Sequence, residues 1–160
     1  MWPSRSMSEL RSELSFRVFL CHASIDKPAV RNLYQRLLYD RVYPWLDEEE
    51  LLPGQNWRQE IERVMRRIPA VIVCLSRNSI TKAGYVQREI QFTLDLLAHQ
   101  PEGSVFLIPA RLEECEVPDR LQDIHYCDLY REAGYNRLLL ALHLRARQLG
   151  VALEARPRSS

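Results

Sequence analysis

Four cysteines and four histidines are the side chains of this sequence that can bind a metal ion or form disulfide bonds. No two cysteines have the CxxC spacing of metal or redox motifs, and His125 beside Cys127 lacks a second ligand pair at zinc spacing. Cys21 and Cys74 lie in or at the end of apolar runs, where a free cysteine behaves as a small core residue; Cys115 is the fourth. The spacing therefore predicts no metal site and no disulfide framework, and indicates a reducing, cytoplasmic setting.

The glycines exclude the common phosphate-binding loops. All five are far apart, so neither GxGxxG nor GxxxxGK[ST] occurs, and a GxSxG hydrolase elbow is also absent. A response regulator needs an acidic pair after the first strand and an aspartate after the third. The residues at those positions are Cys21-His22 and Leu75-Ser76, so that class is excluded as well.

Length and composition favour one globular domain. The chain has 160 residues, of which 46% are hydrophobic and 27% charged, with a net charge of +1. That balance predicts neither nucleic-acid nor membrane binding. No segment approaches the roughly 18 apolar residues of a membrane span, and residues 1–15 lack the apolar stretch of a signal peptide.

Buried strands alternate with amphipathic helices along the chain, which predicts a parallel sheet wrapped by helices. The continuous apolar run over 70–75 is typical of a strand covered on both faces. We expect an N-terminal arm over residues 1–15, one domain over 16–149 and a disordered C-terminal tail over 150–160. The strands are expected at 16–21, 42–46, 70–75, 104–110 and within 121–128, and the helices at 26–38, 57–68, 84–99 and 134–149.

Five segments in this order resemble TIR (Toll/interleukin-1 receptor) domains of the bacterial, NAD+-cleaving type. They are Phe19–Lys27, Trp45–Gly54 (the BB loop of the family), Ala70–Ser76, Gly84–Ile90 and Phe106–Leu112. The resemblance covers nearly the whole chain from 16 to 149. It implies a flavodoxin-like three-layer α/β/α fold with a five-stranded parallel sheet of order 2-1-3-4-5, in agreement with the pattern of elements.

The resemblance implies that Glu89 is the catalytic carboxylate of an NAD+ glycohydrolase (NAD+ nucleosidase), with NAD+ as substrate and no cofactor or metal. Loss of nicotinamide from its ribose passes through an oxocarbenium-like transition state, which an anionic carboxylate can stabilise. Ligands of open α/β sheets bind at the carboxyl ends of the strands, where the strand order reverses. Tyr85 lies four residues before Glu89 and shares its helical face, so its ring can stack on the substrate.

The candidate substrate-binding residues are Tyr85, Asp47, His22, Ser24 and Leu52. Each residue of the site also has a plainer interpretation. Glu89 can be an exposed helical glutamate, Tyr85 half-buried core, His22 a strand-end histidine bonded to backbone, and Ser24 a loop cap. The acidic run from Asp47 can be a solvated loop. The segment Cys21–Ser24 stands where some NAD+-cleaving members have arginines, so contacts with the substrate are expected to differ there.

The loop over 47–54 carries four acidic residues and then Leu51, Leu52 and Pro53, which predicts an interaction site. We expect open-ended self-association through this loop, with arginines such as Arg63 on a neighbouring copy as one partner face; the alternative is a loop that packs its leucines on its own domain. The resemblance also implies signalling in bacterial anti-phage defence and a sensor domain on a longer parent chain. The rival hypothesis is a non-enzymatic TIR adaptor acting through the same loop.

Overall fold

The computed structural model describes residues 16–45, 53–81 and 85–153; the candidates Asp47 and Leu52 lie outside these residues. Five strands form one parallel sheet in the order β2-β1-β3-β4-β5, which confirms the predicted topology. The strands are β1 (Arg17–Cys21), β2 (Tyr43–Trp45), β3 (Ala70–Leu75), β4 (Leu107–Arg111) and β5 (Cys127–Asp128). The helices are η1 (Ser24–Asp26), α2 (Lys27–Tyr39), α3 (Trp57–Arg67), α4 (Arg77–Thr81), α5 (Tyr85–Leu97), η3 (Asp119–Leu121) and α6 (Gly134–Leu149).

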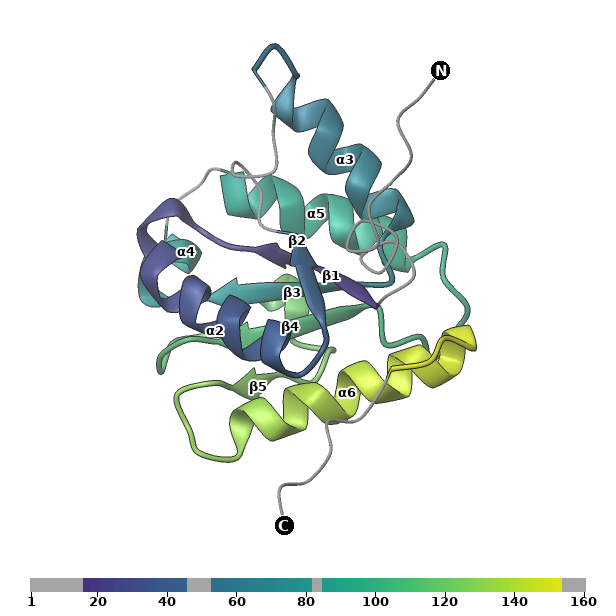
Figure 1. Ribbon diagram of the computed structural model, residues 1–160. Helices are drawn as coiled ribbons and strands as arrows, with labels where there is room; N and C mark the ends of the chain where they lie inside the picture. Colours follow the sequence, from purple (N-terminus) through teal and green to yellow (C-terminus); the bar gives the residue numbers. More distant parts are fainter. Residues whose placement is uncertain (1–15, 46–52, 82–84, 154–160) are drawn as a thin grey trace.

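Helices cover both faces of the sheet and give the predicted three layers (Figure 1). Helices α2 and α6 pack on one face, where alternate strand residues such as Val18, Leu20 and Ile72 point. Helices α3 and α5 cover the other face, which buries the intervening residues, Phe19 and Val71 among them. Because successive side chains of a strand point to opposite faces, strands this apolar on both sides must lie between two layers.

Local sequence sets where the helices begin and end. Asn56 accepts a hydrogen bond from the Gln59 amide (3.2 Å) and caps the start of α3. Gly150, at φ 68°, ends α6 in the left-handed conformation that glycine adopts most easily. Gly134, at the other end of α6, contacts the Asp128 carbonyl so closely that any Cβ would overlap it. A side chain at position 134 would therefore push α6 away from β5.

The structure differs from the predicted elements in two main places. The short helix α4 was not predicted, because its five residues show no helical period. Strand β4 begins at Leu107 instead of 104.

Residues beside the predicted elements also pack on the core. Met65 is fully buried among the described side chains of α3. Beyond α6, the Val151 amide bonds the Ala146 carbonyl (2.9 Å) and Leu153 packs on the core.

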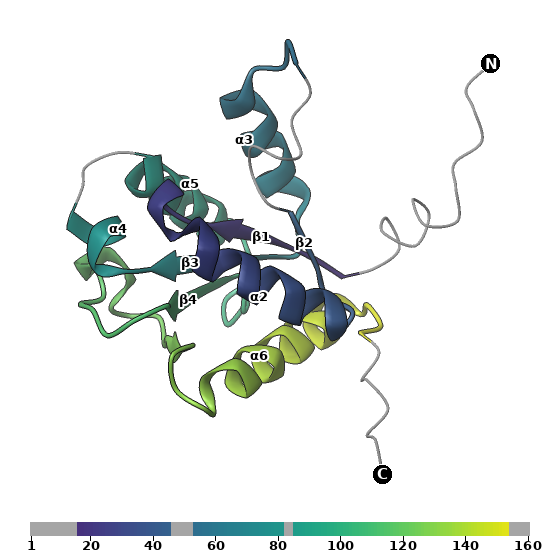
Figure 2. The same cartoon turned by 60° about the vertical axis from the view of Figure 1, so that its left-hand side comes forward.

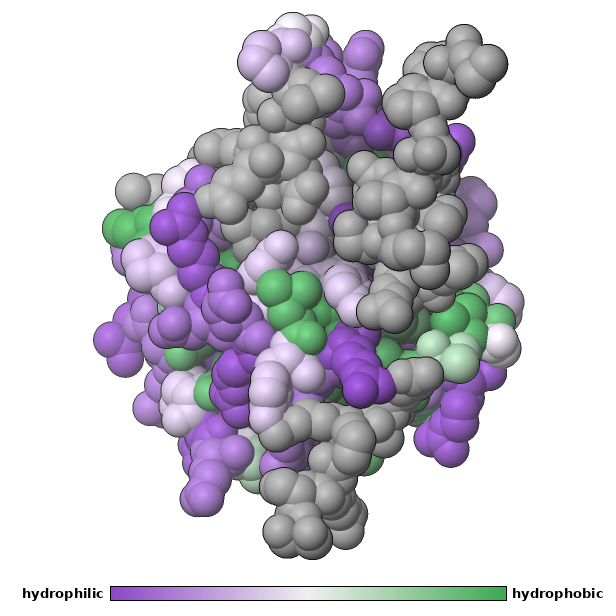
Figure 3. All heavy atoms as spheres, viewed as in Figure 1, coloured by the Kyte–Doolittle hydropathy of each residue, from purple (hydrophilic) through white to green (hydrophobic). Residues whose placement is uncertain are grey.

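None of the helices in the described ranges is long and apolar enough to cross a membrane. The face of the molecule in Figure 3 is mostly hydrophilic, with hydrophobic side chains in small separate groups.

Candidate functional site

The order of the strands places the loop after β1 beside the chain that leaves β3. Strands β1 and β3 are direct neighbours, with Cys21 paired to Val73, and β2 lies on the other side of β1. In Figure 2 the arrowheads of β3 and β4 point toward the side of the molecule where α4 lies. The candidate site is therefore at the carboxyl edge between β1 and β3, where the order of the strands reverses.

His22 follows β1 directly and is buried, with 1% of its surface exposed. Its Nδ1 lies 3.0 Å from the Leu20 carbonyl oxygen. This geometry is that of a strand-end histidine held by backbone, the plainer of the two interpretations. The substrate-binding role of His22 stays a prediction and needs the ring to become accessible.

Ser24 is exposed and begins the short helix η1, which turns the chain from β1 into α2. The turn is held by backbone bonds: the Asp26 amide donates to the Ala23 carbonyl (2.9 Å), and the Lys27 amide to the Ser24 carbonyl. Ser24 thus stands at the surface of the candidate edge, and its predicted contact with substrate remains a prediction.

Ser76 connects the two walls of the candidate site, which are the loop after β1 and the start of α4. Its hydroxyl, which is buried, donates to Asp26 Oδ2 at 2.7 Å, a contact across 50 positions of the sequence. The same oxygen accepts from the Ser79 amide (3.1 Å), while Ser79 Oγ accepts from the Ser76 amide (2.8 Å). Ser76 therefore caps α4 and also joins α4 to the start of α2. No pattern in the sequence predicts the hydrogen bond between Asp26 and Ser76.

Glu89 and Tyr85 belong to α5, and their side chains lie outside the described part of the structure. The backbone places position 89 one turn into α5, which follows β3 and α4. Ile90 and Thr93 of this helix are fully buried against the sheet. Successive helical residues are rotated by about 100°, so position 89 lies beside that buried face and shares its side of the helix with position 85.

Three of the four cysteines are buried in the core. The described thiols are all free, and no group of histidine, cysteine and acidic side chains among the described residues has the arrangement of a metal site. Burial raises the pKa of Cys127 to about 11 and raises the pKa of Cys74 still further, which favours the protonated thiols. The burial of Cys21 and Cys74 confirms their predicted place in the core, and Cys127 is a core residue that was not predicted.

The opposite half of the carboxyl edge holds an arginine network. Arg111, at the end of β4, donates to both carboxylate oxygens of Asp128 (Nε–Oδ1 2.6 Å and Nη2–Oδ2 2.9 Å). It also donates to the Cys115 carbonyl (2.7 Å) and to the Tyr130 hydroxyl (3.0 Å), and its guanidinium lies 4.6 Å from the centre of the Tyr126 ring. The hydrogen bonds from Arg111 hold the pKa of Asp128 below its usual range.

A cavity of about 590 Å³ lies beside this network, lined by residues that include Arg111, Cys115 and Tyr126. Four of the five N–H groups of Arg111 already have protein acceptors, so the guanidinium is a structural link and has little capacity left for a ligand. This network was not predicted, because its partners come from separate loops.

The model of the TIR domain family matches residues 18–139, which is most of the chain and both halves of the carboxyl edge. This chain belongs to the TIR domain family. The TIR domain is 32% identical over 107 residues to a protein named NAD(+) hydrolase TcpA from Theionarchaea archaeon (strain DG-70-1). That match covers 66% of this chain but 31% of TcpA, so the chain spans about a third of its relative.

Solved structures of similar shape support the fold. The TIR domain of the Toll-related receptor TRR-2 from Hydra magnipapillata has a TM-score of 0.66 at 21% identity, over 79% of this chain and 97% of its own. A prokaryotic SEFIR domain has a TM-score of 0.60 at 18% identity, over 80% of this chain and 99% of its own. The TIR domains of the activated Roq1 resistosome have a TM-score of 0.56 at 16% identity, over 84% of this chain and 99% of their own. At these identities the likeness concerns the fold alone.

Proposed function

We propose that this TIR domain is an NAD+ glycohydrolase that releases nicotinamide and leaves ADP-ribose or a cyclic ADP-ribose. The observation that carries the proposal is the position of Glu89 in α5, directly after the β3–α4 segment at the edge where the strand order reverses. The similarity to a protein named NAD(+) hydrolase supports the same activity.

The proposed chemistry needs one carboxylate. Nicotinamide leaves as a neutral base from a cationic ring, so no general acid has to protonate it. As the bond breaks, positive charge develops on the ribose, and an ionised Glu89 stabilises that charge, holds the ribose hydroxyls or attacks the anomeric carbon. NAD+ is the substrate in this proposal, and no cofactor or metal takes part.

The surrounding residues of the proposed site bind and orient NAD+. Tyr85 stacks on the nicotinamide or adenine ring, and Asp47, His22 and Ser24 bind polar groups of the substrate. Asp26 and Ser76 hold the two walls together through their 2.7 Å hydrogen bond, which supports a fixed spacing between the β1 loop and the start of α4. These two residues position the site without touching substrate in this scheme.

The proposal extends to activation by self-association. The segment 47–54, with its four acidic residues and Leu52, docks on a neighbouring copy and builds open-ended strands in which each active site is completed. Following the resemblance, we place this activity in bacterial anti-phage defence, with a sensor domain on a longer parent chain as the trigger.

Product analysis tests the proposed function. The chain is incubated with NAD+ at increasing protein concentration, and nicotinamide, ADP-ribose and cyclic product are separated by chromatography. We expect nicotinamide release whose specific rate rises steeply with concentration, and the variant Leu52→Asp should flatten that rise. Nicotinamide no higher than in a Glu89→Gln control at every concentration would reject the enzyme and favour the non-enzymatic adaptor.

A further inference from the structure

Exposed apolar side chains gather in one groove between α6 and the β4–β5 edge of the sheet. The groove has a volume of about 430 Å³ and is lined on one side by α6 and on the other by residues of 104–108 and 124–127. Among the described residues, eight large apolar side chains are exposed, and three of them line this groove: Tyr126 (36%), Leu140 (69%) and Leu144 (41%). Such a concentration marks a binding surface more often than chance exposure.

The groove cannot accept a regular added strand. Strand β5 covers only Ala110 and Arg111 of β4. The Val71 amide bonds the Phe106 carbonyl and the Leu129 amide bonds the Arg111 carbonyl, so odd-numbered residues of β4 face the outer edge. One of these is Pro109, which has no N–H to donate. An occupant therefore docks through its side chains and not by extending the sheet.

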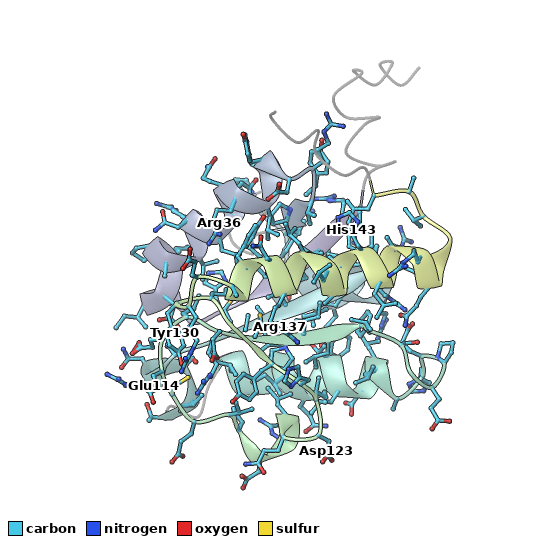
Figure 4. All side chains as sticks on the ribbon, turned by 90° about the horizontal axis from the view of Figure 1, so that it is seen from below. Arg36, Glu114, Asp123, Tyr130, Arg137 and His143 are labelled. Atoms are coloured by element: carbon cyan, nitrogen blue, oxygen red, sulfur yellow. The ribbon has the colours of Figure 1, made fainter. Side chains whose placement is uncertain are left out.

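The charge that lines the groove is positive. Its lining includes Arg137 and no aspartate or glutamate. Figure 4 shows His143 on the opposite side of α6 from Arg137, and His143 lines a separate hollow with Arg147. Within the described ranges no carboxylate forms an ion pair with Arg137. The groove therefore complements an occupant with negative charge.

Two other occupants fit this surface less well. Two copies of α6 packed face to face would bring arginines against arginines, which is unfavourable. A protein surface that inserts into a lipid bilayer is a convex apolar face, whereas Leu140 and Leu144 line a concave groove. A peptide that fills the hollow with apolar side chains satisfies both the shape and the charge.

We propose that this groove binds an acidic amphipathic segment of a partner protein. Leucine-type side chains of the segment pack against Leu140 and Leu144, and its carboxylates meet Arg137. The surface belongs to α6 and the outer edge of the sheet, away from the β1–β3 edge, so the inference holds whether or not the domain cleaves NAD+.

A labelled helical peptide of about four turns, with leucines on one face and glutamates on the other, is the probe. Its binding to the whole chain is measured by fluorescence anisotropy at low and high salt. Leu144→Ser should weaken binding by about fivefold or more, because it removes an apolar contact. The matched control is Leu149→Ser, on the same helix and equally exposed (41%) but outside the groove.

Charge is tested with Arg137→Glu, which should weaken binding by about tenfold and remove most of its salt dependence. Arg67→Glu on α3, in the opposite layer, makes the same change of net charge and should leave binding intact. A peptide with lysine in place of glutamate should not bind.

Several results would overturn the proposal. Equal losses in Leu144→Ser and Leu149→Ser, or equal binding of the lysine peptide, would show that the groove is not the site. Binding to phosphatidylserine vesicles that Leu144→Ser abolishes would assign the face to lipid. Self-association by sedimentation velocity that Leu144→Ser abolishes would assign it to a second copy of the chain.

Discussion

The two halves of the carboxyl edge are built from different interactions. At the β4–β5 half, Arg111 and Asp128 form a two-point ion pair whose side chains are 13% and 17% exposed, with further bonds to Cys115 and Tyr130. At the β1–β3 half, the Ser76 hydroxyl donates to the Asp26 carboxylate at 2.7 Å. The described link at one half is a guanidinium network with several acceptors, and at the other it is a hydroxyl bond to a carboxylate.

This difference predicts that one half of the edge contributes mainly to stability and the other mainly to catalytic activity. A guanidinium whose donors are occupied by protein groups rigidifies the loops around it but has little capacity to bind a ligand. A hydroxyl bond between two loops constrains them less than such a network, and functional loops are drawn from the less stable parts of a fold. We therefore expect substitutions at the β4–β5 half to change unfolding and those at the β1–β3 half to change catalysis.

The largest expected effect is that of Glu89→Gln, which keeps the shape of the side chain and removes its charge. Nicotinamide release should fall about a thousandfold, roughly 4 kcal/mol of barrier. The free energy of unfolding should change by under about 0.5 kcal/mol. Near-native turnover in this variant would show that Glu89 is not the catalytic carboxylate and that the β1–β3 half is not the catalytic half.

Replacing Arg111 by leucine should lower the stability of the fold and leave the catalytic rate unchanged. Asp128 would lose its two-point partner in a partly buried site and keep the exposed Arg131 at 3.2 Å, so we expect a loss of about 2 kcal/mol in unfolding free energy, measured in urea. The rate per folded molecule should stay the same. The control is Arg77→Leu, which breaks an exposed pair with Glu113 (3.6 Å) and should cost under about 1 kcal/mol.

Low pH should remove the stability that the Arg111–Asp128 ion pair adds to the folded state. The folded state lowers the pKa of Asp128, so the ion pair adds stability above the unfolded pKa of about 3.9 and loses it as the pH falls through the lower folded pKa. The difference in unfolding free energy between the native chain and Arg111→Leu should therefore narrow as the pH is lowered from about 5 toward 3. A constant difference over that range would assign the loss to packing.

Ser76→Ala tests the weaker link between the walls. Removing the hydroxyl should cost about 1 kcal/mol of stability and lower kcat/KM by about tenfold. Asp26→Asn keeps an acceptor for the Ser76 hydroxyl, so this variant should retain much of the activity of the native chain. The control Ser104→Ala removes a hydroxyl bonded to the Pro101 carbonyl (2.6 Å) at the other end of the sheet and should leave kcat/KM unchanged. Equal effects of the two serine variants on kcat/KM would contradict the positioning role.

The smallest effect is expected for Tyr85→Phe, because stacking uses the face of the ring and not the hydroxyl. The Michaelis constant should change by about twofold or less in Tyr85→Phe and rise strongly in Tyr85→Ala. If Tyr85→Ala instead lowers the melting temperature while the Michaelis constant of the folded fraction is unchanged, Tyr85 is a core residue.

Sequence alone determined the layers, and the resemblance to a family gave the sheet order. A continuous apolar run such as Ala70–Leu75 is typical of a strand covered on both faces, and alternation with helices favours parallel strands. The motifs around His22, Asp47 and Glu89 indicated the family and predicted the edge where a ligand would bind. These signals are local in sequence, either periodic or contiguous, which is why they can be read without coordinates.

Tertiary structure alone decided which polar groups meet. Asp26 and Ser76 are separated by 50 positions, and Arg111 and Asp128 by 17, so no periodicity connects them. Burial of His22 also follows from packing around the end of β1, since a histidine after an apolar run is equally compatible with exposure. The groove beside α6 exists because β5 has only two residues and leaves the first three residues of β4 uncovered. Such pairings and gaps depend on the relative positions of elements, which hydrophobic patterning does not specify.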